Sequence, residues 1–434
     1  MRMRKIFRFN STSCYRKVRS PAAWAVLCLA VCMLGLGVSA AAHERTTIIT
    51  FDVPGAGTSA GQGTTPNGID SRGAVVGWYA DSGNVNHGFL RAPDGKFTTF
   101  DAPGAGTGAY QGTVAFAINP AGAITGTYFD ANCLYHGFLR APDGKFTTFD
   151  APGGGTVGGV CSTMTFWLVM EGTSAQNINA AGTITGIYTD ASGVGHIFLR
   201  APDGTFTTFD APGAGTGDVQ GTWTPTFYGL NPAGAITGWY VDDSNALHGY
   251  LRTAKGAVAT FDVPGGGTGA IQGTVGMSLN PEEEVTGFYL DGSNVFHGFL
   301  RARHGKLTTF DAPGAGTGAY QGTMVSSNNP AGAITGNYTD TNDVNHGFLR
   351  APEGKFITFD VPGAGTGAYE GTFPYGNNPA GAIVGAYVDA NGVSHGFLRT
   401  PGDAELLLRW SRLFARVCEP RDRFSSRVQA FAEV

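Results

Sequence analysis

Seven histidines and seven aspartates recur at a constant spacing, and they are the residues of this sequence best suited to chemistry. Each histidine begins a His-x-(Phe/Tyr)-Leu-Arg segment, and each aspartate lies in a Phe-Asp-(Ala/Val)-Pro-Gly segment. A histidine beside a carboxylate can act as an acid–base pair or hold a metal ion. An offset of 14 residues, with the last histidine returning to the first aspartate, predicts the pairs His87/Asp101, His136/Asp150, His196/Asp210, His248/Asp262, His297/Asp311, His346/Asp360 and His395/Asp52.

The regular recurrence of these pairs favours a structural role. Ligands of one metal ion must converge to within about 2 Å of it, whereas equivalent residues of a symmetric ring lie far apart. We therefore interpret the pairs as polar contacts between neighbouring strands and expect no metal at the histidines.

A second set of carboxylates follows a repeated Tyr-x-Asp pattern, at Asp81, Asp130, Asp190, Asp242, Asp291, Asp340 and Asp389. Calcium prefers such oxygen ligands. None of these loops has the full Asp-x-Asp-x-Asp-Gly pattern, however, and Asp, Asn and Gly are also typical of tight turns. We expect no cofactor, with calcium as the alternative.

The elements that position these residues are short strands. In the second copy, residues 112–119, 123–130, 136–140 and 145–150 have the β-branched and aromatic composition of strands. A three-residue turn at Pro142-Asp143-Gly144 would set Phe138 opposite Thr148. Four strands in about 49 residues fit the length of one propeller blade.

The unit occurs seven times, with eleven extra residues in the third copy and three in the fourth. The predicted fold is an all-β, seven-bladed β-propeller of four-stranded antiparallel blades over residues 43–400. Residues 46–52 have the pattern of a fourth strand, and the last copy lacks one. We predict that this N-terminal strand completes the last blade, because an open array would expose sheet edges.

The pattern Ile118-Asn119…Gly122…Ile124-x-Gly126, followed by His136-Gly137-Phe138-Leu139, resembles the bacterial extracellular HAF repeat family over residues 46–400. The family usually has Ala after the histidine and Trp after the leucine, where this chain mostly has Gly and Arg. It also has a Leu-Gly-rich segment where this chain has Pro-Gly-Ala-Gly-Thr. The resemblance implies an exported, propeller-like repeat protein and implies no activity.

Both ends of the chain differ from the repeats. Residues 1–42 combine a basic start with an apolar run from Ala22 to Val38, which predicts a signal peptide, with an uncleaved membrane anchor as the alternative. Residues 401–434 have the pattern of a short basic amphipathic helix. We expect a protein that is secreted, periplasmic or on the cell surface of a bacterium, with no stable membrane insertion after signal cleavage.

The net charge of residues 41–400, the body of the chain, argues against nucleic acid as a partner. Residues 41–400 carry 15 Lys or Arg against 28 Asp or Glu. Because this excess of negative charge repels phosphate backbones, we expect no binding of nucleic acid. We expect a monomer whose partner is a glycan or a protein.

Residues that break the symmetry are the better candidates for function. The candidate ligand-binding side chains are aromatic residues in the linkers and in the enlarged third and fourth copies: Phe166, Trp167, Trp223, Tyr110, Tyr320 and Tyr369. The alternative interpretations are a tyrosine wedged between blades and a tolerated loop expansion. Cys133 and Cys161 are expected on one face, where a disulfide could join them.

No Gly-x-Ser-x-Gly, His-Glu-x-x-His or phosphate-loop motif is present, and we assign no catalytic residue. The favoured hypothesis is an exported non-enzymatic binding or scaffold module for a glycan or protein. The alternative is a polysaccharide-active hydrolase or lyase that uses the central channel, which would require carboxylates, His or Tyr gathered at the channel from unlike positions.

Overall fold

A computed structural model describes residues 46–158, 161, 171–226 and 228–402. Within this part, residues Thr46–Pro401 form one compact unit of 28 strands. The predicted signal peptide at 1–42 and nearly all of the predicted tail helix at 401–434 lie outside the described residues. In the described part, no helix has the length and apolar character needed to cross a membrane.

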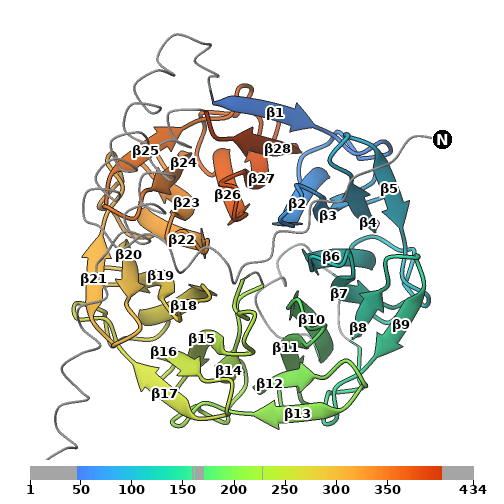
Figure 1. Cartoon of the computed structure of the whole chain (residues 1–434), viewed down its shortest axis with the longest axis horizontal. Helices are drawn as coiled ribbons and strands as arrows, with labels where there is room; N and C mark the ends of the chain where they lie inside the picture. Colours follow the sequence, from blue (N-terminus) through green and yellow to red (C-terminus); the bar gives the residue numbers. More distant parts are fainter. Residues whose placement is uncertain (1–45, 159–160, 162–170, 227, 403–434) are drawn as a thin grey trace, which may run out of the picture. The chain divides into compact units, whose positions relative to one another are not determined.

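The strands pair in antiparallel groups of four that are arranged around a ring, as Figure 1 shows. The strands nearest the centre are β2 (Gly63–Ile69), β6 (Gly112–Ile118), β10 (Gly172–Ile178), β14 (Gly221–Trp223), β18 (Gly273–Leu279), β22 (Gly322–Asn328) and β26 (Gly371–Asn377). The second strands are β3 (Val75–Ala80), β7 (Ile124–Phe129), β11 (Ile184–Thr189), β15 (Ile236–Val241), β19 (Val285–Leu290), β23 (Ile334–Thr339) and β27 (Ile383–Val388).

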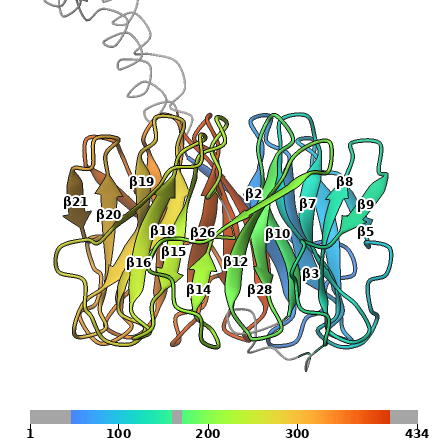
Figure 2. The same ribbon diagram turned by 90° about the horizontal axis from the view of Figure 1, so that it is seen from below.

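The third strands are β4 (Asn86–Arg91), β8 (Tyr135–Arg140), β12 (Gly195–Arg200), β16 (Leu247–Arg252), β20 (Phe296–Arg301), β24 (Asn345–Arg350) and β28 (Ser394–Thr400). The outer strands are β5 (Phe97–Phe100), β9 (Phe146–Phe149), β13 (Phe206–Phe209), β17 (Val258–Phe261), β21 (Leu307–Phe310), β25 (Phe356–Phe359) and β1 (Thr47–Phe51). We number the groups by their inner strands, so that group 1 holds β2 and group 7 holds β26. Figure 2 shows the strands of these groups from the side.

Neighbouring groups are connected by one parallel β-bridge, and we call the contact between two groups a joint. In the first joint Asn86, at the start of β4, pairs with Gly112, at the start of β6. Gly112 has a φ of 105°, and a side chain there would collide with the Asn86 carbonyl. The joint therefore needs glycine at this point, because any side chain would force the two groups apart.

The core between groups is aromatic. Phe138 of β8 is fully buried and contacts Phe100 of the preceding outer strand edge-on, with ring centroids 6.3 Å apart. The guanidinium of Arg140 lies 4.9 Å from the centre of the Phe100 ring. This packing recurs around the ring and gives the repeated Phe and Arg a common role, since each pair ties one group to the next.

The ring is closed by the first strand. Residues Thr47–Phe51 pair antiparallel with β28, with Phe51 opposite Gly396, and β1 lies beside β28 in Figure 1. The Phe51 ring contacts Phe89 of group 1 at a centroid distance of 6.5 Å. The predicted all-β class and the β-propeller type of repeated, closed sheet are thus observed.

Candidate functional site

The structure brings together the two members of all seven predicted His–Asp pairs. The distance from the histidine Nδ1 to the nearer carboxylate oxygen is 2.8–3.0 Å in every pair. The pair His395/Asp52 joins residues from opposite ends of the ring sequence at 2.9 Å. The predicted hydrogen-bonding reach is therefore observed in every copy.

The aspartates of these pairs lie outside the strands in which we expected them. We expected each one to lie within a fourth strand, as in residues 145–150, and to face its histidine across the sheet. The outer strands instead end one residue earlier, at phenylalanines such as Phe100 and Phe149, so that every aspartate lies just beyond the paired strands. The aspartate side chains are 49–64% exposed: Asp52, Asp101, Asp150, Asp210, Asp262, Asp311 and Asp360.

The residue after each aspartate explains why the strand pairing stops there. The N–H of Ala102, which follows Asp101, donates to the Thr113 hydroxyl of the next inner strand at 2.9 Å. The same bond follows Asp150, Asp311 and Asp360, and joins Ala151 to Thr173, Ala312 to Thr323 and Val361 to Thr372. Because the backbone is already bonded to the next group, the aspartate does not extend the sheet. It begins the segment that connects the outer strand of one group to the inner strand of the next, which we call the linker.

The pairs are polar contacts at the start of the linkers. A contact that involves a half-exposed carboxylate contributes little to stability, typically about 0–1 kcal/mol. Each histidine holds the start of a linker against its own group, and the carboxylate of that linker stays open to solvent. The aspartates are thus accessible surface groups at the joints between groups.

A second carboxylate, which we had interpreted as a calcium ligand or a turn residue, faces the other ring nitrogen. The distances from Nε2 to the aspartate of the Tyr-x-Asp loop are 3.3–3.8 Å. This aspartate stands six residues before the histidine in every copy. Each histidine thus lies between two aspartates, and we call this Asp–His–Asp arrangement a triad. The constant spacing was a signal from which the triads could have been predicted.

In groups 2 and 3, the two carboxylates beside the histidine raise its pKa. In group 3, the hydrogen bond to Asp210 raises the pKa of His196 against the opposing effect of its burial. Burial disfavours ionised Asp190, but hydrogen bonds from the N–H groups of Val194 and Ser192 outweigh it, so the pKa of Asp190 is lowered. The Tyr188 ring stacks on the imidazole with centroids 4.9 Å apart, which fixes its orientation.

The two shifts predict a pH window for stability. Because the pKa of His196 is raised in the folded protein, its contribution is full below about pH 6.5 and is lost as the pH rises through the folded value. The lowered pKa of Asp190 gives a contribution to stability that is present above about pH 3.9 and is lost on acidification.

We expect the melting temperature to be higher at pH 5.5 than at pH 8.5. The double variant H136Q/H196Q should reduce this difference, whereas H304Q, in a hairpin turn outside the triads, should not. An unchanged difference in the double variant would remove the histidines as its cause.

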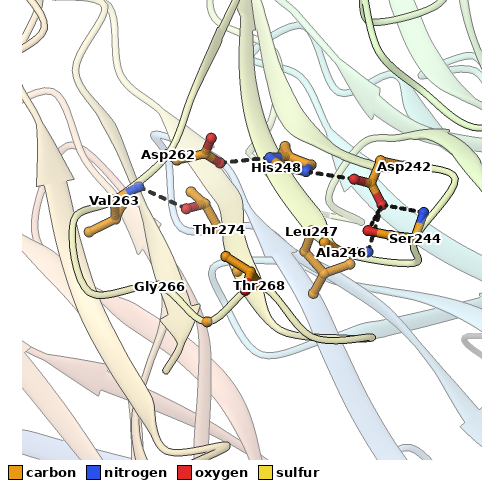
Figure 3. Close-up of a pocket in the computed structure, with 12 residues that line it drawn as sticks. Asp242, Ser244, Ala246, Leu247, His248, Asp262, Val263, Gly266, Thr268 and Thr274 are labelled. Carbon is orange, nitrogen blue, oxygen red and sulfur yellow. Dashed lines mark hydrogen bonds and ion pairs between the residues drawn. The ribbon is translucent and has the colours of Figure 1, made fainter. Parts of the chain in front are cut away.

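One triad lines a cavity of about 300 Å³ at the joint between groups 4 and 5. Figure 3 shows His248 between Asp242 and Asp262, with the linker residues Gly266 and Thr268 across from them. Only one oxygen of Asp262 is bonded to the imidazole, and the side chain is 64% exposed. The cavity therefore presents a carboxylate oxygen and a threonine hydroxyl in a space at the small end of ligand pockets.

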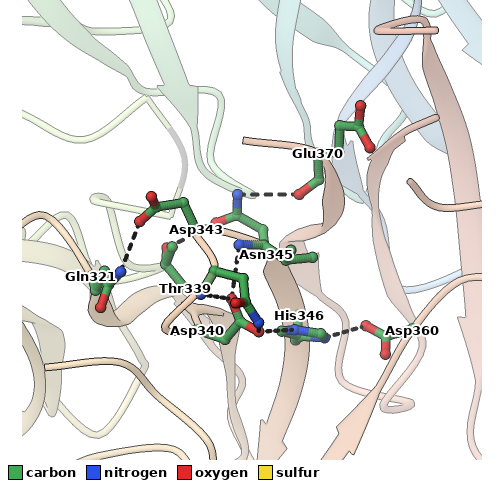
Figure 4. A network of polar contacts seen from close by, with 10 residues as sticks. Gln321, Thr339, Asp340, Asp343, Asn345, His346, Asp360 and Glu370 are labelled. Carbon is green, nitrogen blue, oxygen red and sulfur yellow. Dashed lines mark hydrogen bonds and ion pairs between the residues drawn. The ribbon is translucent and has the colours of Figure 1, made fainter. Parts of the chain in front are cut away.

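The walls of such a joint are held by polar contacts from both groups. In Figure 4, Asn345 at the start of β24 accepts a hydrogen bond from Thr339, and its amide donates to the Glu370 carbonyl of the next linker. Gln321 binds the carboxylate of Asp343 at 2.8 Å. The bond to Glu370 holds this loop to the linker that follows it, and the bond from Gln321 holds the same loop to the linker that precedes it.

The aromatic candidates fall into three places. Tyr110, Tyr320 and Tyr369 lie in the linkers, where Tyr320 and Tyr369 are exposed and Tyr110 is partly buried. Trp223 lies within β14 and not in an open loop; its indole nitrogen is buried without a hydrogen bond, and a side chain at Gly195 would collide with its ring. Phe166 and Trp167 lie outside the described residues.

A disulfide joins Cys133, in the loop between β7 and β8, to Cys161, in the third linker. The Cα atoms are 5.4 Å apart, and 28 residues separate the two cysteines. The bond therefore fastens the enlarged linker to the preceding group.

Reduction of this disulfide should destabilise the protein. Closing a loop of this length contributes about 3 kcal/mol in the chain-entropy description. We expect dithiothreitol to lower the denaturation midpoint of the wild-type protein in urea. The variant C133A/C161A should have the lower midpoint with or without reductant, and a wild-type midpoint that ignores reductant would contradict the role of the bond.

The fourth copy, which has three extra residues, sends part of its chain towards the inner strands of other groups. β14 has only three residues, and Tyr228 beyond it accepts a hydrogen bond from the Ile69 N–H of group 1. Its carbonyl accepts another from Leu279 of group 5, and burial raises the pKa of its hydroxyl to about 12. Tyr228 thus links inner strands of three groups across the channel.

Of the residue types that the channel-enzyme alternative required, the described inner strands contain only one tyrosine, Tyr375 of β26. None of the seven described inner strands contains Asp, Glu or His. Tyr228 is engaged with backbone groups at the ends of inner strands. The carboxylates and histidines described above lie instead at the joints between groups.

No protein-family model and no curated protein matches this chain. Among solved structures, it is similar to the BP39L lectin from Burkholderia pseudomallei at 10% identity, over 83% of this chain and 98% of the lectin, with a TM-score of 0.46. It is also similar to the six-bladed lectin of Aleuria aurantia (12% identity, 73% and 95% coverage, TM-score 0.35) and to puromycin hydrolase (12%, 83% and 54%, TM-score 0.40). A lectin and a hydrolase at such low scores assign no ligand or activity to this protein.

Proposed function

We propose that this protein is an exported, non-enzymatic seven-bladed β-propeller that binds glycans at the joints between its blades. The seven groups are the blades, and β1 supplies the outer strand of the last one. The HAF-type repeat and the signal-like residues 1–42 support export.

The observation that carries this proposal is the cavity between groups 4 and 5. Its volume of about 300 Å³ is suited to one sugar ring. The free oxygen of Asp262 accepts hydrogen bonds from hydroxyl groups, and the hydroxyl of Thr268 both donates and accepts. A sugar offers adjacent hydroxyls of this kind, whereas the negative charge of the body disfavours an anionic ligand.

Repetition strengthens the case for a binding module. Every blade carries the same Asp–His–Asp arrangement, whereas acid–base catalysis needs one site at which unlike groups converge. A ring of similar weak sites suits a ligand with repeated units, since linked sites gain effective concentration when bound together.

The test is the number of sugars bound. A glycan array identifies a saccharide, and native mass spectrometry then counts the equivalents bound to the protein. We expect more than one equivalent, with one fewer for T268W, whose indole would fill the cavity between groups 4 and 5.

The matched control is K96A, in the hairpin turn between β4 and β5, where the Lys96 side chain is 85% exposed. This variant should retain every equivalent. A protein that binds no saccharide on the array, or a T268W variant with undiminished binding, would contradict the proposal.

A further inference from the structure

In all but one of the described linkers, the same position combines a bulky side chain with a backbone conformation that such side chains avoid. It is the residue two before the glycine of the parallel bridge, and we call it the rim position. In the described linkers it has a positive φ in every copy: Gly61 (78°), Tyr110 (65°), Val219 (62°), Ile271 (66°), Tyr320 (63°) and Tyr369 (67°). The equivalent Met170 lies outside the described residues.

Burial does not explain the large residues at the rim position. Ile271 is 67% exposed, Tyr320 62% and Tyr369 78%. A left-handed conformation strains a side-chain-bearing residue, most of all a β-branched one such as Ile271. Glycine adopts it freely, and Gly61 fills the same place in one linker. The exposed Ile271, Tyr320 and Tyr369 therefore gain little packing in return for this strain, whereas Tyr110 and Val219 are half-buried.

Exposed apolar side chains are concentrated on these linkers. Of the five large apolar residues exposed in the described part of the chain, four lie in linkers: Val157, Ile271, Tyr320 and Tyr369. Each of these four linkers therefore offers one exposed apolar side chain for contact with a ligand.

In the joint between groups 4 and 5, the rim position is close in the chain to residues that line the cavity. The Ile271 N–H donates to the Asn245 carbonyl at 2.7 Å. Ile271 stands between the lining residues Thr268 and Gly273, and Asn245 stands between the lining residues Ser244 and Ala246. The same bond joins Tyr320 to Asn294 and Tyr369 to Asp343, each at 2.7 Å.

We infer that the rim residue sets the affinity of each joint for sugar, and that the three tyrosine joints form the tight class of sites. This inference rests on the proposed glycan binding and adds which joints bind best. A pyranose has an apolar face of C–H groups, and an aromatic ring fixed beside hydroxyl-binding groups can stack against that face. Ile271 and Val219 offer a smaller apolar surface, and Gly61 offers none.

The experiment compares the wild-type protein with Y110G/Y320G/Y369G, using the saccharide found on the array and calorimetric titration. The variant adopts the backbone conformation of Gly61, so its melting temperature should not fall. We expect it to lose three tight equivalents, whose affinity drops by about tenfold or more. Y110F/Y320F/Y369F keeps the stacking surface and should keep these sites, and G61Y should add one.

The outcomes separate the two proposals. Wild-type binding that survives the triple glycine variant unchanged would overturn the role of the rim position alone. A wild-type protein that binds no saccharide would overturn the proposed function and this inference with it. Loss of binding in the triple phenylalanine variant would also overturn the stacking role, because only hydroxyls differ.

Discussion

A chain that begins at Val53 is expected to lose the cooperative fold of the chain that begins at Thr46. Removing β1 takes away five residue pairs with β28 and the hydrogen bond between His395 and Asp52. It also removes the Phe51 ring, which contacts Phe89 and lies 5.0 Å from the Arg91 guanidinium. Loss of the phenylalanine contacts alone costs about 3 kcal/mol, and a whole domain is stable by only about 5–15 kcal/mol.

Thermal unfolding followed by circular dichroism measures this effect. The point variant F51A should lower the stability by about 2–4 kcal/mol. I49A on the same strand should have a much smaller effect, because Ile49 is 44% exposed. Attaching residues 46–52 after Thr400 through a Pro-Asp-Gly turn should restore the fold. A shortened chain that melts like the longer one would show that the ring is not closed by β1.

Gly112→Ala should be among the most damaging single substitutions, with a loss of about 3–5 kcal/mol. The added methyl group would collide with the Asn86 carbonyl across the parallel bridge, and the φ of 105° adds strain for any residue with a side chain. The equivalent Gly273 lines the cavity between groups 4 and 5, so the same kind of joint shapes the candidate site.

Gly73→Ala is the matched control. Gly73 also has a positive φ, of 89°, but a methyl group there would meet nothing within 4 Å. Its cost should be limited to the backbone strain, about 1–2 kcal/mol. Urea denaturation of both variants separates the collision from the strain, and equal losses would mean that the joint tolerates a side chain.

The hairpins and the ring closure could be predicted because both follow from local rules. The turn at Pro142-Asp143-Gly144 sets the register, and Phe138 indeed lies opposite Thr148. The coarse all-β, closed repeat followed from the spacing of the copies. The phase of the repeat, with an extra outer strand at one end and a missing one at the other, pointed to the pairing of β1 with β28.

The end of each outer strand was predicted one residue too late. The register of the hairpin places Asp150 opposite His136, and the two side chains do meet at 2.8 Å. The backbone after Asp150, however, is bonded to Thr173 of the next group. Spacing within one copy could not reveal this bond, because its acceptor belongs to the copy that follows.

The second carboxylate of each triad was missed because its role depends on a neighbouring strand. Tyr128 pairs with His136 across β7 and β8, and Asp130 lies two residues after Tyr128. Residues two apart on a strand point to the same face, so the side chain of Asp130 returns to the histidine. The constant spacing of six residues was visible, but we interpreted the loop carboxylates as metal ligands or turn residues.

The path of the fourth copy could not be predicted from spacing. Pro225 follows the short β14, but Pro66 and Pro374 lie within inner strands of seven residues, so a proline alone does not end an inner strand here. The chain leaves the strand and its Tyr228 contacts inner strands of other groups. We had treated the enlarged fourth copy as a source of ligand-binding residues, because aromatic insertions are common in binding loops. Only tertiary contacts distinguish a binding loop from a segment that packs among the inner strands.

Hydrogen–deuterium exchange with and without the bound saccharide tests most directly whether the joints between groups are the ligand-binding sites. We predict slower exchange on binding in the loops that follow the second strands, such as 242–248, and in the linkers, such as 262–274. Exchange in the β4–β5 hairpin turn at 92–96 should not change. Slower exchange confined to the inner strands and to Tyr228 would place the ligand in the channel and contradict binding at the joints.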